Sequence, residues 1–456
     1  MHINTGDTAW VLMSSALVLL MTPGLAFFYG GMVRSKAVLN MVMMSMVTIG
    51  IVTPLWVLYG YSLTFGNAHA SGLVGDLSRL GLSDTLTARA VNGSAYPIPL
   101  LAFAAFQLMF AIVTPALISG AIADRAKFGA WAVFVAVWVT LVYFQVAHWV
   151  FAFGAASGAG AGWLARWGVV DFAGGTAVHV NAGAAGLALA LVLGKRIGWR
   201  RDPMRPHNLP MVMLGAGLLW FGWFGFNAGS ALGANGSAAT ALMNTQVATA
   251  TGVLGWLVVE RVRDGRPTTL GAASGAVAGL VAITPSCAAV TPVGSIALGL
   301  LAGAVCAGAV GLKYRLGFDD SLDVVGVHLV GGALGSILIG LLASPSSVTG
   351  TTGVLYGGGL AGWVLLGKQT VAVLVVGGFS FAMAFTIGKV VDKTIGFRVE
   401  AAAESAGIDL SAHAEAAYDL HIPRGAEREG LVPVPAPGPD LVPAVAEVEE
   451  QVERVS

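Results

Sequence analysis

The chain has 456 residues, of which 56% are hydrophobic and only 11% are charged. A soluble protein carries about 25% charged residues, so this composition and the mean hydropathy of +0.78 exclude an ordinary soluble globular protein. The formal net charge is zero, which gives no reason to expect a nucleic-acid partner. The sequence therefore predicts an all-α polytopic membrane protein.

Eleven segments are apolar over about the 20 residues that a bilayer crossing needs. They lie near residues 9–31, 39–65, 98–121, 129–152, 172–194, 209–231, 239–260, 268–286, 290–311, 323–343 and 363–388. The first segment lacks a basic start and is too long for a signal peptide, so we expect it to remain as a span. An odd number of spans places the two termini on opposite sides of the membrane.

The basic side chains gather in alternate connections between these segments. Only Arg79, Arg89, Arg166 and Lys368 lie in one set of connections, and the other 20 of the 24 Lys and Arg residues lie in the second set and the tail. Because basic connections stay in the cytoplasm, we expect the N-terminus outside and the C-terminus inside.

Residues 1–388 form the predicted transmembrane domain and residues 389–456 a cytoplasmic C-terminal regulatory tail. The stretch GFRVEAAAESAGIDLSAHAEAAYDL has a mixed polarity that favours ordering against the membrane domain. Beyond about residue 424 the tail is rich in Pro and Glu, which predicts disorder. The two cysteines, Cys287 and Cys306, lie in apolar segments and indicate no disulfide framework.

Two histidines stand in similar strings, HVNAGAAG from His179 and HLVGGALG from His328. Each histidine and its small residues at i+3, i+4 and i+7 share one helix face, against which another helix can pack closely. The histidines lie on the fifth and tenth predicted spans, an interval that gives two halves of opposite topology. We therefore expect inverted repeats over about 9–194 and 209–343, followed by an eleventh helix over about 363–388.

A single histidine on an apolar helix is about as often a packing residue as a functional one, but a matched pair favours function. Neutral imidazole both donates and accepts hydrogen bonds, so two facing rings can line a polar path or pass a proton through a dry pore. No HExxH motif or third ligand accompanies them, which excludes a metal site.

An aspartate precedes each histidine near the start of its span, Asp171 in the first case and Asp323 in the second. Aspartate at a helix start is a favoured N-cap, and such a cap matters more in a membrane, where water is absent. We therefore predict that Asp171 and Asp323 cap their helices. Asp171 also adds negative potential near any cation site.

Aromatic residues cluster on two of the predicted spans. Phe103, Phe106 and Phe110 share one helix face, and LWFGWFGFNAGS (219–230) places several rings together. Interfacial aromatic belts explain rings near span ends, but several of these lie deeper. Aromatic faces attract cations, and phenyl rings can close a narrow pore to a hydrated ion.

Five strings together resemble the ammonium transporter family, the Amt/Mep/Rh proteins, and its bacterial Amt branch in particular. They are DFAGGTAVHVNAG (171–183), PHNLPMV (206–212), GWFGFNAGSA (222–231), AITPSC (282–287) and DVVGVHLVGG (323–332). The resemblance runs over about residues 8–420. It implies eleven helices in a 5+5 pseudo-two-fold arrangement, one pore per subunit and a homotrimer.

The resemblance also assigns site residues. It implies twin pore histidines at His179 and His328, a phenylalanine gate at Phe110 and Phe226, an outer ammonium site at Phe106, Gln107, Phe151, Ser230 and Asp171, and pore-lining positions at Trp223, Thr284 and Tyr143. The family usually has tryptophan where this chain has Phe151. A phenyl ring binds cations less well than indole, so either recruitment is weaker or Trp149 substitutes for it.

The implied function is ammonium transport in the inner cell membrane for nitrogen uptake. Ammonium would be recruited at the outer site and deprotonated, and ammonia would cross the histidine-lined pore, with electrogenic uptake if the proton is carried separately. No cofactor is implied, methylammonium is left open as a further substrate, and a PII-type nitrogen regulatory protein is the implied cytoplasmic partner. The 154–170 loop is longer than usual, and EAAAESAGID (400–409) replaces a charged stretch of the tail.

Two other functional classes compete with ammonium transport. An intramembrane enzyme would use aspartate or histidine, but the sequence shows no nucleophile elbow, metal triad or second catalytic acid. An ammonium sensor that signals through a cytoplasmic partner is the remaining alternative, and the tail carries no recognisable output domain.

Overall fold

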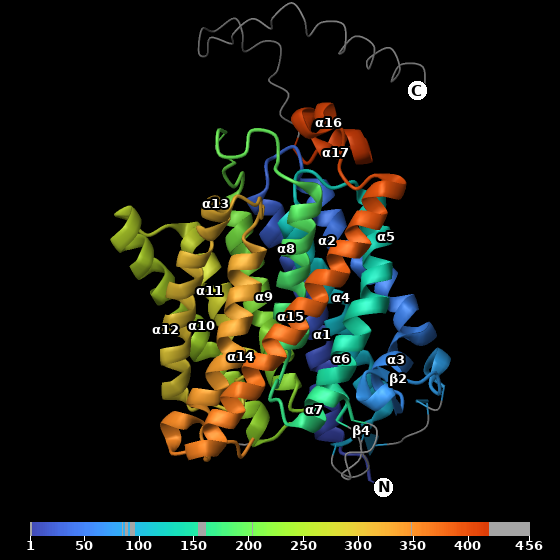
Figure 1. Ribbon diagram of the computed structural model, residues 1–456, viewed down its shortest axis with the longest axis vertical. Helices are drawn as coiled ribbons and strands as arrows, with labels where there is room; N and C mark the ends of the chain where they lie inside the picture. The colour runs from blue at the N-terminus through green and yellow to red at the C-terminus, as the bar shows by residue number, and fades with distance from the viewer. Residues whose placement is uncertain are drawn as a thin grey trace, which may run out of the picture. The chain divides into compact units, whose positions relative to one another are not determined.

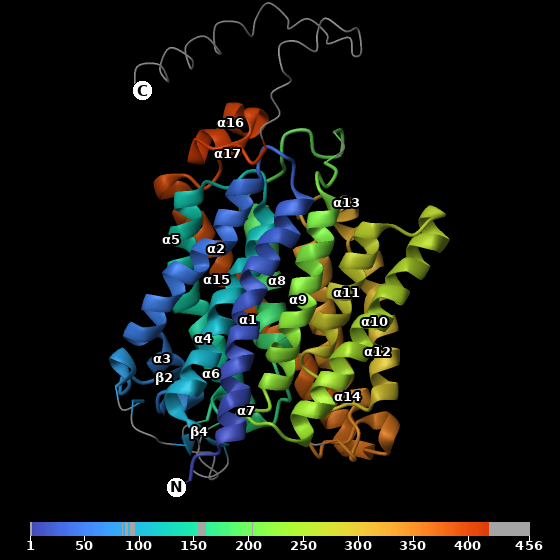
Figure 2. The ribbon, with the colours of Figure 1, turned by 180° about the vertical axis from the view of Figure 1, so that it is seen from behind.

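In the computed structural model the chain forms a bundle of long helices that run between two opposite ends (Figures 1 and 2). The structure describes residues 2–83, 85–86, 90–91, 96–153, 161–202, 204–347 and 349–418. Helix α1 begins at one end, here called the N-terminal face. The short helices α16 (Ala401–Ala406) and α17 (Ile408–His413) lie at the other end, here called the tail face (Figure 1).

The first half of the chain supplies five candidate spans, three of which contain a π-helical turn. They are α1 (Thr5–Met32); α2 (Val38–Leu55) with η1 (Trp56–Gly60) and α3 (Tyr61–Phe65); α4 (Leu100–Ser119) with η4 (Gly120–Ile122); α5 (Phe128–Trp138) with η5 (Val139–Tyr143) and α6 (Phe144–Phe151); and η6 (Gly175–Val180) with α8 (Asn181–Leu193). The one-turn helix α7 (Trp163–Trp167) precedes the fifth span at the N-terminal face (Figure 1).

The second half continues the bundle. Its helices are α9 (Leu209–Gly229), α10 (Gly236–Asp264), α11 (Thr269–Ile283), α12 (Pro292–Ala309) with α13 (Leu312–Leu316), η7 (Val325–Leu329) with α14 (Val330–Leu342), the short η8 (Val354–Tyr356) and α15 (Gly359–Ile395). Helix α15 runs obliquely across the bundle from the N-terminal face to the tail face (Figure 1). It extends beyond the predicted end at residue 388.

Ten helices in the described part of the chain are long and apolar enough to cross a membrane, against eleven predicted spans. The difference lies at the predicted span 268–286, where α11 has only 15 residues. Pro285 follows the helix and has no N–H to continue it. The next residues are buried but not helical, and the Asn244 side chain donates hydrogen bonds to the carbonyls of Cys287 and Val290 at 2.7 and 2.8 Å. Irregular backbone is tolerated at membrane depth only where protein satisfies it in this way.

The sequence did not predict two small hairpins at the N-terminal face, one beside α3 and the other beside the start of α4 (Figure 1). Strand β1 (Ala68–His69) pairs with β2 (Val74–Gly75), and β3 (Ala90–Val91) pairs with β4 (Tyr96–Pro99), both antiparallel. Strands this short show no alternation of polar and apolar residues. The single turn η2 (Ala70–Gly72) lies between β1 and β2, and the single turn η3 (Leu80–Leu82) lies between β2 and β3.

Glycine allows the helices to approach closely at the centre of the bundle. A Cβ atom at Gly215 of α9 would lie 2.2 Å from the backbone nitrogen of Phe28 in α1. A Cβ atom at Gly183 of α8 would lie 2.4 Å from the backbone nitrogen of Leu329 in η7. Small residues that let backbones touch are typical of membrane helix interfaces. The two histidine-bearing spans therefore cross each other at contact distance.

The first part of the tail folds against the tail face of the bundle. The Glu404 carboxylate accepts the backbone N–H of Ile197 at 2.6 Å and pairs with Arg398 at 2.8 Å. The Asp409 carboxylate accepts the backbone N–H groups of Leu39 and Asn40 at 3.0 and 2.8 Å. One compact unit therefore extends through Ala417. The predicted disorder beyond residue 424 falls outside the described residues.

Candidate functional site

The two histidines of the matched strings meet at the centre of the bundle. His179 lies in η6 and His328 in η7, and each side chain is almost fully buried. Their Nδ1 atoms are 3.3 Å apart, and the rings are nearly parallel with centroids 5.3 Å apart. One Nδ1 must carry a proton and the other must accept it. The pair therefore shares one hydrogen bond and keeps opposite tautomers.

Both histidines occupy π-helical turns, which widen a helix by one residue and recur at functional sites. The turn of His179 begins beside Asp171, whose carboxylate accepts the backbone N–H groups of Gly174, Gly175, Thr176 and Ala177 at 2.7–3.2 Å. The Thr176 hydroxyl also donates to it. The carboxylate thus satisfies the N–H groups that this helix start would otherwise leave unpaired.

The structure differs from the prediction at Asp323. The cap of the His328 turn is Asp320, whose carboxylate accepts the N–H groups of Val324 and Val325 at 3.1 and 2.8 Å. Asp323 instead accepts a hydrogen bond from Lys313 at 2.6 Å. The prediction of Asp323 as the cap is therefore wrong.

The sequence carries a signal that identifies the correct residue. Asp171 precedes His179 by eight residues and Asp320 precedes His328 by eight, whereas Asp323 precedes it by only five. Burial raises the pKa of the Asp320 carboxyl to about 6, although the charge of Lys313 opposes this shift.

A contiguous stack of aromatic rings leads toward the histidines. The Phe106 and Phe110 ring centroids are 4.9 Å apart, and those of Phe110 and Phe226 are 4.3 Å apart. The Phe226 ring then lies 6.1 Å from the His179 ring. All three phenyl rings are buried. The three rings and the His179 ring therefore form one buried aromatic stack.

Trp223 and Thr284 lie beside the histidine pair. The Trp223 ring stacks on His179 with centroids 5.3 Å apart, and its Nε1 donates to the Thr284 hydroxyl at 2.8 Å. Thr284 donates in turn to the Leu280 carbonyl at 2.7 Å. Tyr143 is also buried, but its ring neighbours are Trp138 and Phe144, and it is not among the described residues that line the histidine cavity.

The histidines face a narrow apolar cavity. The cavity volume open to the centre of a water-sized sphere is about 10 Å³. This is close to the smallest volume that can hold one water molecule. Apart from His179 and His328, the cavity is lined by Met21, Leu25, Phe28, Val113, Leu117, Val178, Leu219, Trp223, Phe226 and Val277.

Two further cavities continue this one toward the tail face. The first shares Phe28, Val277 and His328 with the histidine cavity and adds Asp323. The second is a vestibule of about 480 Å³ that shares Met32 and Asp323 with the first. The three cavities form a discontinuous path from the histidines to the tail face.

The residues predicted for the outer site lie on the side of the histidines that faces the N-terminal face. They form two separate groups. Phe106 lies against Gly229 of α9, where a Cβ atom would be 2.9 Å from its ring. The next residue, Ser230, donates its hydroxyl to the Phe226 carbonyl at 2.8 Å, which leaves its oxygen able to accept. Gln107 is buried on α4.

Phe151 belongs to the second group, beside the helix start that Asp171 caps. A Cβ atom at Gly174 would lie 3.6 Å from its Cζ. Trp149 points elsewhere: its Nε1 donates to the Leu73 carbonyl at 2.8 Å, and its ring packs on Phe379 of α15 with centroids 4.8 Å apart. The Trp149 indole is therefore held by Leu73 and by α15.

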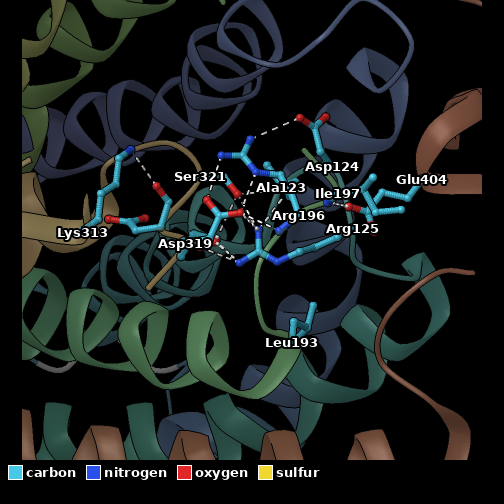
Figure 3. Close-up of polar contacts among 12 residues, drawn as sticks. Ala123, Asp124, Arg125, Leu193, Arg196, Ile197, Lys313, Asp319, Ser321 and Glu404 are labelled. Carbon is cyan, nitrogen blue, oxygen red and sulfur yellow. Dashed lines mark hydrogen bonds and ion pairs between the residues drawn. The ribbon is translucent and has the colours of Figure 1, made fainter. Parts of the chain in front are cut away.

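A buried charge network, which the sequence did not predict, joins Asp124, Arg125, Arg196 and Asp319 (Figure 3), and its members Asp124 and Arg196 line the vestibule. Arg196 donates hydrogen bonds to both carboxylate oxygens of Asp319 at 2.9 Å and also pairs with Asp124 at 3.4 Å. Arg125 donates to the Ser321 hydroxyl and to the Asp319 carbonyl, both at 2.6 Å. The network ties the α4–α5 connection and the end of α8 to the segment that leads into η7.

Burial and pairing act against each other in this network. Burial by itself raises the pKa of the Asp319 carboxyl, but hydrogen bonds from Arg196 and the charge of Arg125 outweigh it, so the pKa lies below its ordinary value. Burial lowers the pKa of the Arg125 guanidinium to about 10, although Asp319 opposes this shift. Both groups therefore stay charged near neutral pH.

Comparison with known proteins adds a separate line of evidence. Residues 9–418 match the family model described as Ammonium Transporter Family. The chain is 56% identical over 439 residues to the ammonium transporter of Mycobacterium tuberculosis, covering 92% of this chain and 91% of that one. It is 46% identical over 417 residues to the ammonium transporter of Bacillus subtilis, covering 91% and 98%.

Two solved structures have folds similar to the fold of this chain. The crystal structure of Candida albicans Mep2 gives a TM-score of 0.78 at 33% identity, covering 88% of this chain and 87% of that one. A structure described as Sensor Amt Protein gives a TM-score of 0.81 at 28% identity, covering 90% and 98%.

Proposed function

This chain belongs to the ammonium transporter family, and on that premise we propose that it takes up ammonium by conducting ammonia along the path past His179 and His328. Membership makes it a multi-pass membrane transporter rather than an enzyme. The observation that carries the proposal is the buried histidine pair in a narrow apolar cavity behind a stack of phenyl rings.

Recruitment would take place at the N-terminal face, above the phenyl rings. The Ser230 oxygen can accept a hydrogen bond from ammonium, and the face of Phe106 adds a cation–π attraction. Gln107 supplies a further polar group at this level. The Asp171 carboxylate already accepts hydrogen bonds from the N–H groups of its helix start. Its proposed role in recruitment is therefore the negative potential that it adds near Phe151.

Selection against potassium follows from the proton. Ammonium and potassium are monovalent cations of similar size, but only ammonium can lose a proton and continue as a neutral molecule. The gate of Phe110 and Phe226 and the narrow cavity beyond make the charged form costly. Ammonia can pass the histidines as both hydrogen-bond donor and acceptor, and it regains a proton beyond them.

The fate of the released proton decides whether transport moves charge. The hydrogen bond between the two Nδ1 atoms gives a proton a route from one ring to the other. If the proton follows that route, uptake is electrogenic. We favour this form because the pair already shares one proton.

The wider setting follows the same family premise. We propose that the N-terminal face is outside the inner cell membrane and the tail face is in the cytoplasm, that there are eleven crossings in two inverted repeats, and that three copies assemble with one path each. The vestibule and the docked tail residues 397–413 offer a surface that a PII-type regulatory protein would cover. Co-purification of such a protein with the full chain, and its loss on deletion of residues 397–418, tests that partner.

Purified protein in liposomes tests the transport proposal directly. We expect an ammonium pulse to give a transient current, potassium to give none, and His179→Ala and His328→Ala each to alter the ammonium response. Gly378→Ala is a matched control, because a Cβ atom there would meet nothing within 4 Å.

Each result separates one proposal from another. Internal alkalinisation without a current would overturn the electrogenic form and leave an ammonia channel. A potassium current as large as the ammonium current would overturn the selection mechanism. No response of either kind would favour the alternative, an ammonium sensor that acts through a cytoplasmic partner.

A further inference from the structure

An ion pair between Lys313 and Asp323 stands where the path from the histidines reaches the vestibule. Lys313 belongs to the short helix α13 (Figure 3), and Asp323 lies just before η7. Asp323 lines the vestibule and also the cavity between the vestibule and the histidines, here called the middle cavity. It is the one acidic residue in the described lining of the middle cavity. A molecule that follows this path from the histidines therefore meets the Asp323 carboxylate.

The Lys313 ammonium group occupies a site built from three kinds of group. Its Nζ donates to Asp323 Oδ1 at 2.6 Å and to the Asp320 carbonyl at 2.9 Å. It also lies 5.5 Å from the ring centroid of Tyr314. A carboxylate, a carbonyl oxygen and an aromatic face are groups that recognise an ammonium head group. The Lys313 side chain is only 9% exposed, so its contacts are largely shielded from water.

The backbone holds Asp323 in an uncommon conformation. Its φ is +64°, in the left-handed region that residues other than glycine seldom adopt. Residues of this kind persist where the surrounding structure determines them, and they gather at binding sites. Capping does not explain Asp323, because the Asp320 carboxylate accepts the N–H groups at the start of η7. Within the described residues, the Asp323 carboxylate pairs with Lys313 and with no other group.

The chemistry of this occupant matches that of the transported ion. A lysine head group is an alkylammonium with three N–H donors, and ammonium has four N–H donors and the same charge. In the proposed function, ammonia regains a proton beyond His328, on the side where Asp323 lines the middle cavity. Ammonium would therefore form beside a carboxylate that already holds an ammonium group of the protein.

We propose that the Asp323 carboxylate and the Asp320 carbonyl form an inner ammonium site, and that Lys313 is a tethered competitor for it. This inference rests on the proposed function. Because Lys313 is part of the same fold, its effective concentration at the site is on the order of millimolar or more. Free ammonium displaces it only at comparable concentrations. Lys313 thus speeds the release of newly formed ammonium and keeps ammonium at the tail face from occupying the path.

Removal of the lysine amine and its replacement by free ammonium test the site. Lys313→Ala leaves the Asp323 carboxylate unpaired and vacates the space of the side chain, so we expect a lower unfolding temperature in detergent. Ammonium chloride should raise it again, by more than in the wild type. If the dissociation constant is on the order of 10 mM, about 100 mM ammonium shifts the folding equilibrium about tenfold toward the folded state. Potassium chloride should do less, because potassium donates no hydrogen bonds, and Lys313→Ala/Asp323→Asn should show no ammonium-specific rise.

Transport supplies a second measurement. Liposomes are equilibrated with ammonium on both sides before the pulse, so the tail face of every copy meets ammonium in either orientation. We expect this background ammonium to halve the current of Lys313→Ala at a concentration about tenfold lower than for the wild type, because the competitor is gone. Lys313→Arg, which keeps a cation beside Asp323, should resemble the wild type.

The matched control is Lys195→Ala. Lys195 follows α8 and stands 4.8 Å from the Trp199 ring centroid, and it is absent from the described lining of the three cavities. Its removal takes a cation from the same end of the bundle and should leave both measurements unchanged. If Lys313→Ala is too unstable to purify, Lys313→Met, which fills more of the space of the side chain, takes its place.

Three results would overturn the inner site. They are an equal rise with potassium, an ammonium rise that persists in the double variant, and unchanged inhibition by background ammonium in Lys313→Ala. Failure of the transport proposal would look different, because the wild type itself would then give no ammonium current. The unfolding measurement does not depend on transport and would still report on the site.

Discussion

At the scale of single residues, the transport proposal depends on the histidine pair. With Nδ1 atoms 3.3 Å apart, only one of the two can carry a proton at that position. His179 also stacks on Trp223, whose indole is fixed by Thr284, so the pair cannot rotate freely. In the proposed mechanism, this donor and acceptor would pass a proton and also contact ammonia.

The family resemblance implies tryptophan at the position where this chain has Phe151. We predict that Phe151→Trp lowers the ammonium concentration for half-maximal transport about two- to fivefold, because indole binds a cation more strongly than a phenyl ring. Phe151→Leu should raise it. Currents from liposomes over a range of ammonium concentrations provide the measurement. Phe381→Trp on α15 is the control, and an equal effect there would count against a cation site at Phe151.

Asp319 is the central acid of the buried charge network. We predict that Asp319→Asn lowers the free energy of unfolding by about 3–5 kcal/mol, since it removes the buried carboxylate that pairs with Arg196 at 2.9 Å and leaves only the longer pair with Asp124. The exposed Asp264→Asn should have almost no effect. Thermal unfolding of the purified protein in detergent compares the two, and equal losses would contradict a special role for the buried network.

The same carboxyl also gives a pH dependence. Its pKa in the folded protein lies below its ordinary value of about 3.9. Its contribution to stability is therefore complete above about pH 4 and is lost as the pH falls through the folded pKa. We expect the unfolding temperature of the wild type to fall between pH 5 and pH 3 more steeply than that of Asp319→Asn.

At the scale of elements, the crossing of the two histidine-bearing spans depends on glycine. A Cβ atom at Gly332 would lie 2.9 Å from the Cβ of His179 and 3.0 Å from the Gly175 carbonyl oxygen. We predict that Gly332→Ala forces the spans apart, costs about 1–3 kcal/mol of stability and abolishes the ammonium current. Gly378→Ala, in open space on α15, should retain both. A fully active Gly332→Ala protein would show that the close crossing is not required.

The sequence predicts the long helices well because about 20 apolar residues in a row have few other solutions in a membrane. It predicts the short features poorly. The hairpin β1–β2 has two residues in each strand, too few for a periodic pattern. Widened turns such as η6 and η7 leave the hydrophobic pattern unchanged, so only the structure reveals them.

The candidate site residues also divide into those that the sequence predicts and those that it does not. Motif matching brings His179, His328, Phe110 and Phe226 to notice, and these side chains do lie in one continuous stack. The sequence did not predict the network around Arg196, because its members are far apart in the chain. Charged residues are also common in the connections between membrane spans, so none of these residues stands out. Three-dimensional contact, rather than local pattern, defines that network.

At the scale of the whole molecule, the path and the tail meet at one end. The vestibule lies at the tail face, where Arg196 lines it and the adjacent Ile197 donates its N–H to Glu404. The charge network also holds the segment before η7, which carries Asp320 and leads to His328. Docking of the tail is therefore connected, through a few direct contacts, to the residues that bound the exit.

Asp409 tests how firmly that docking holds. Helix α2 has no side-chain cap of its own, and Asp409 accepts two of its first N–H groups from about 370 positions away along the chain. We predict that Asp409→Ala weakens this helix start by about 1 kcal/mol and speeds hydrogen exchange at Leu39 and Asn40 about fivefold. Exchange followed by mass spectrometry on peptides covering residues 33–45 and 397–413 provides the measurement.

The control is Ser411→Ala, because within the described residues the Ser411 hydroxyl donates only to the carbonyls of Gly407 and Ile408, at the start of its own short helix. It should leave exchange at Leu39 and Asn40 unchanged. If Asp409→Ala also leaves it unchanged, the tail does not cap α2 in solution. If both peptides exchange faster together, α2 and the tail open as one unit, and a partner that binds the tail would then act on the first half of the bundle directly.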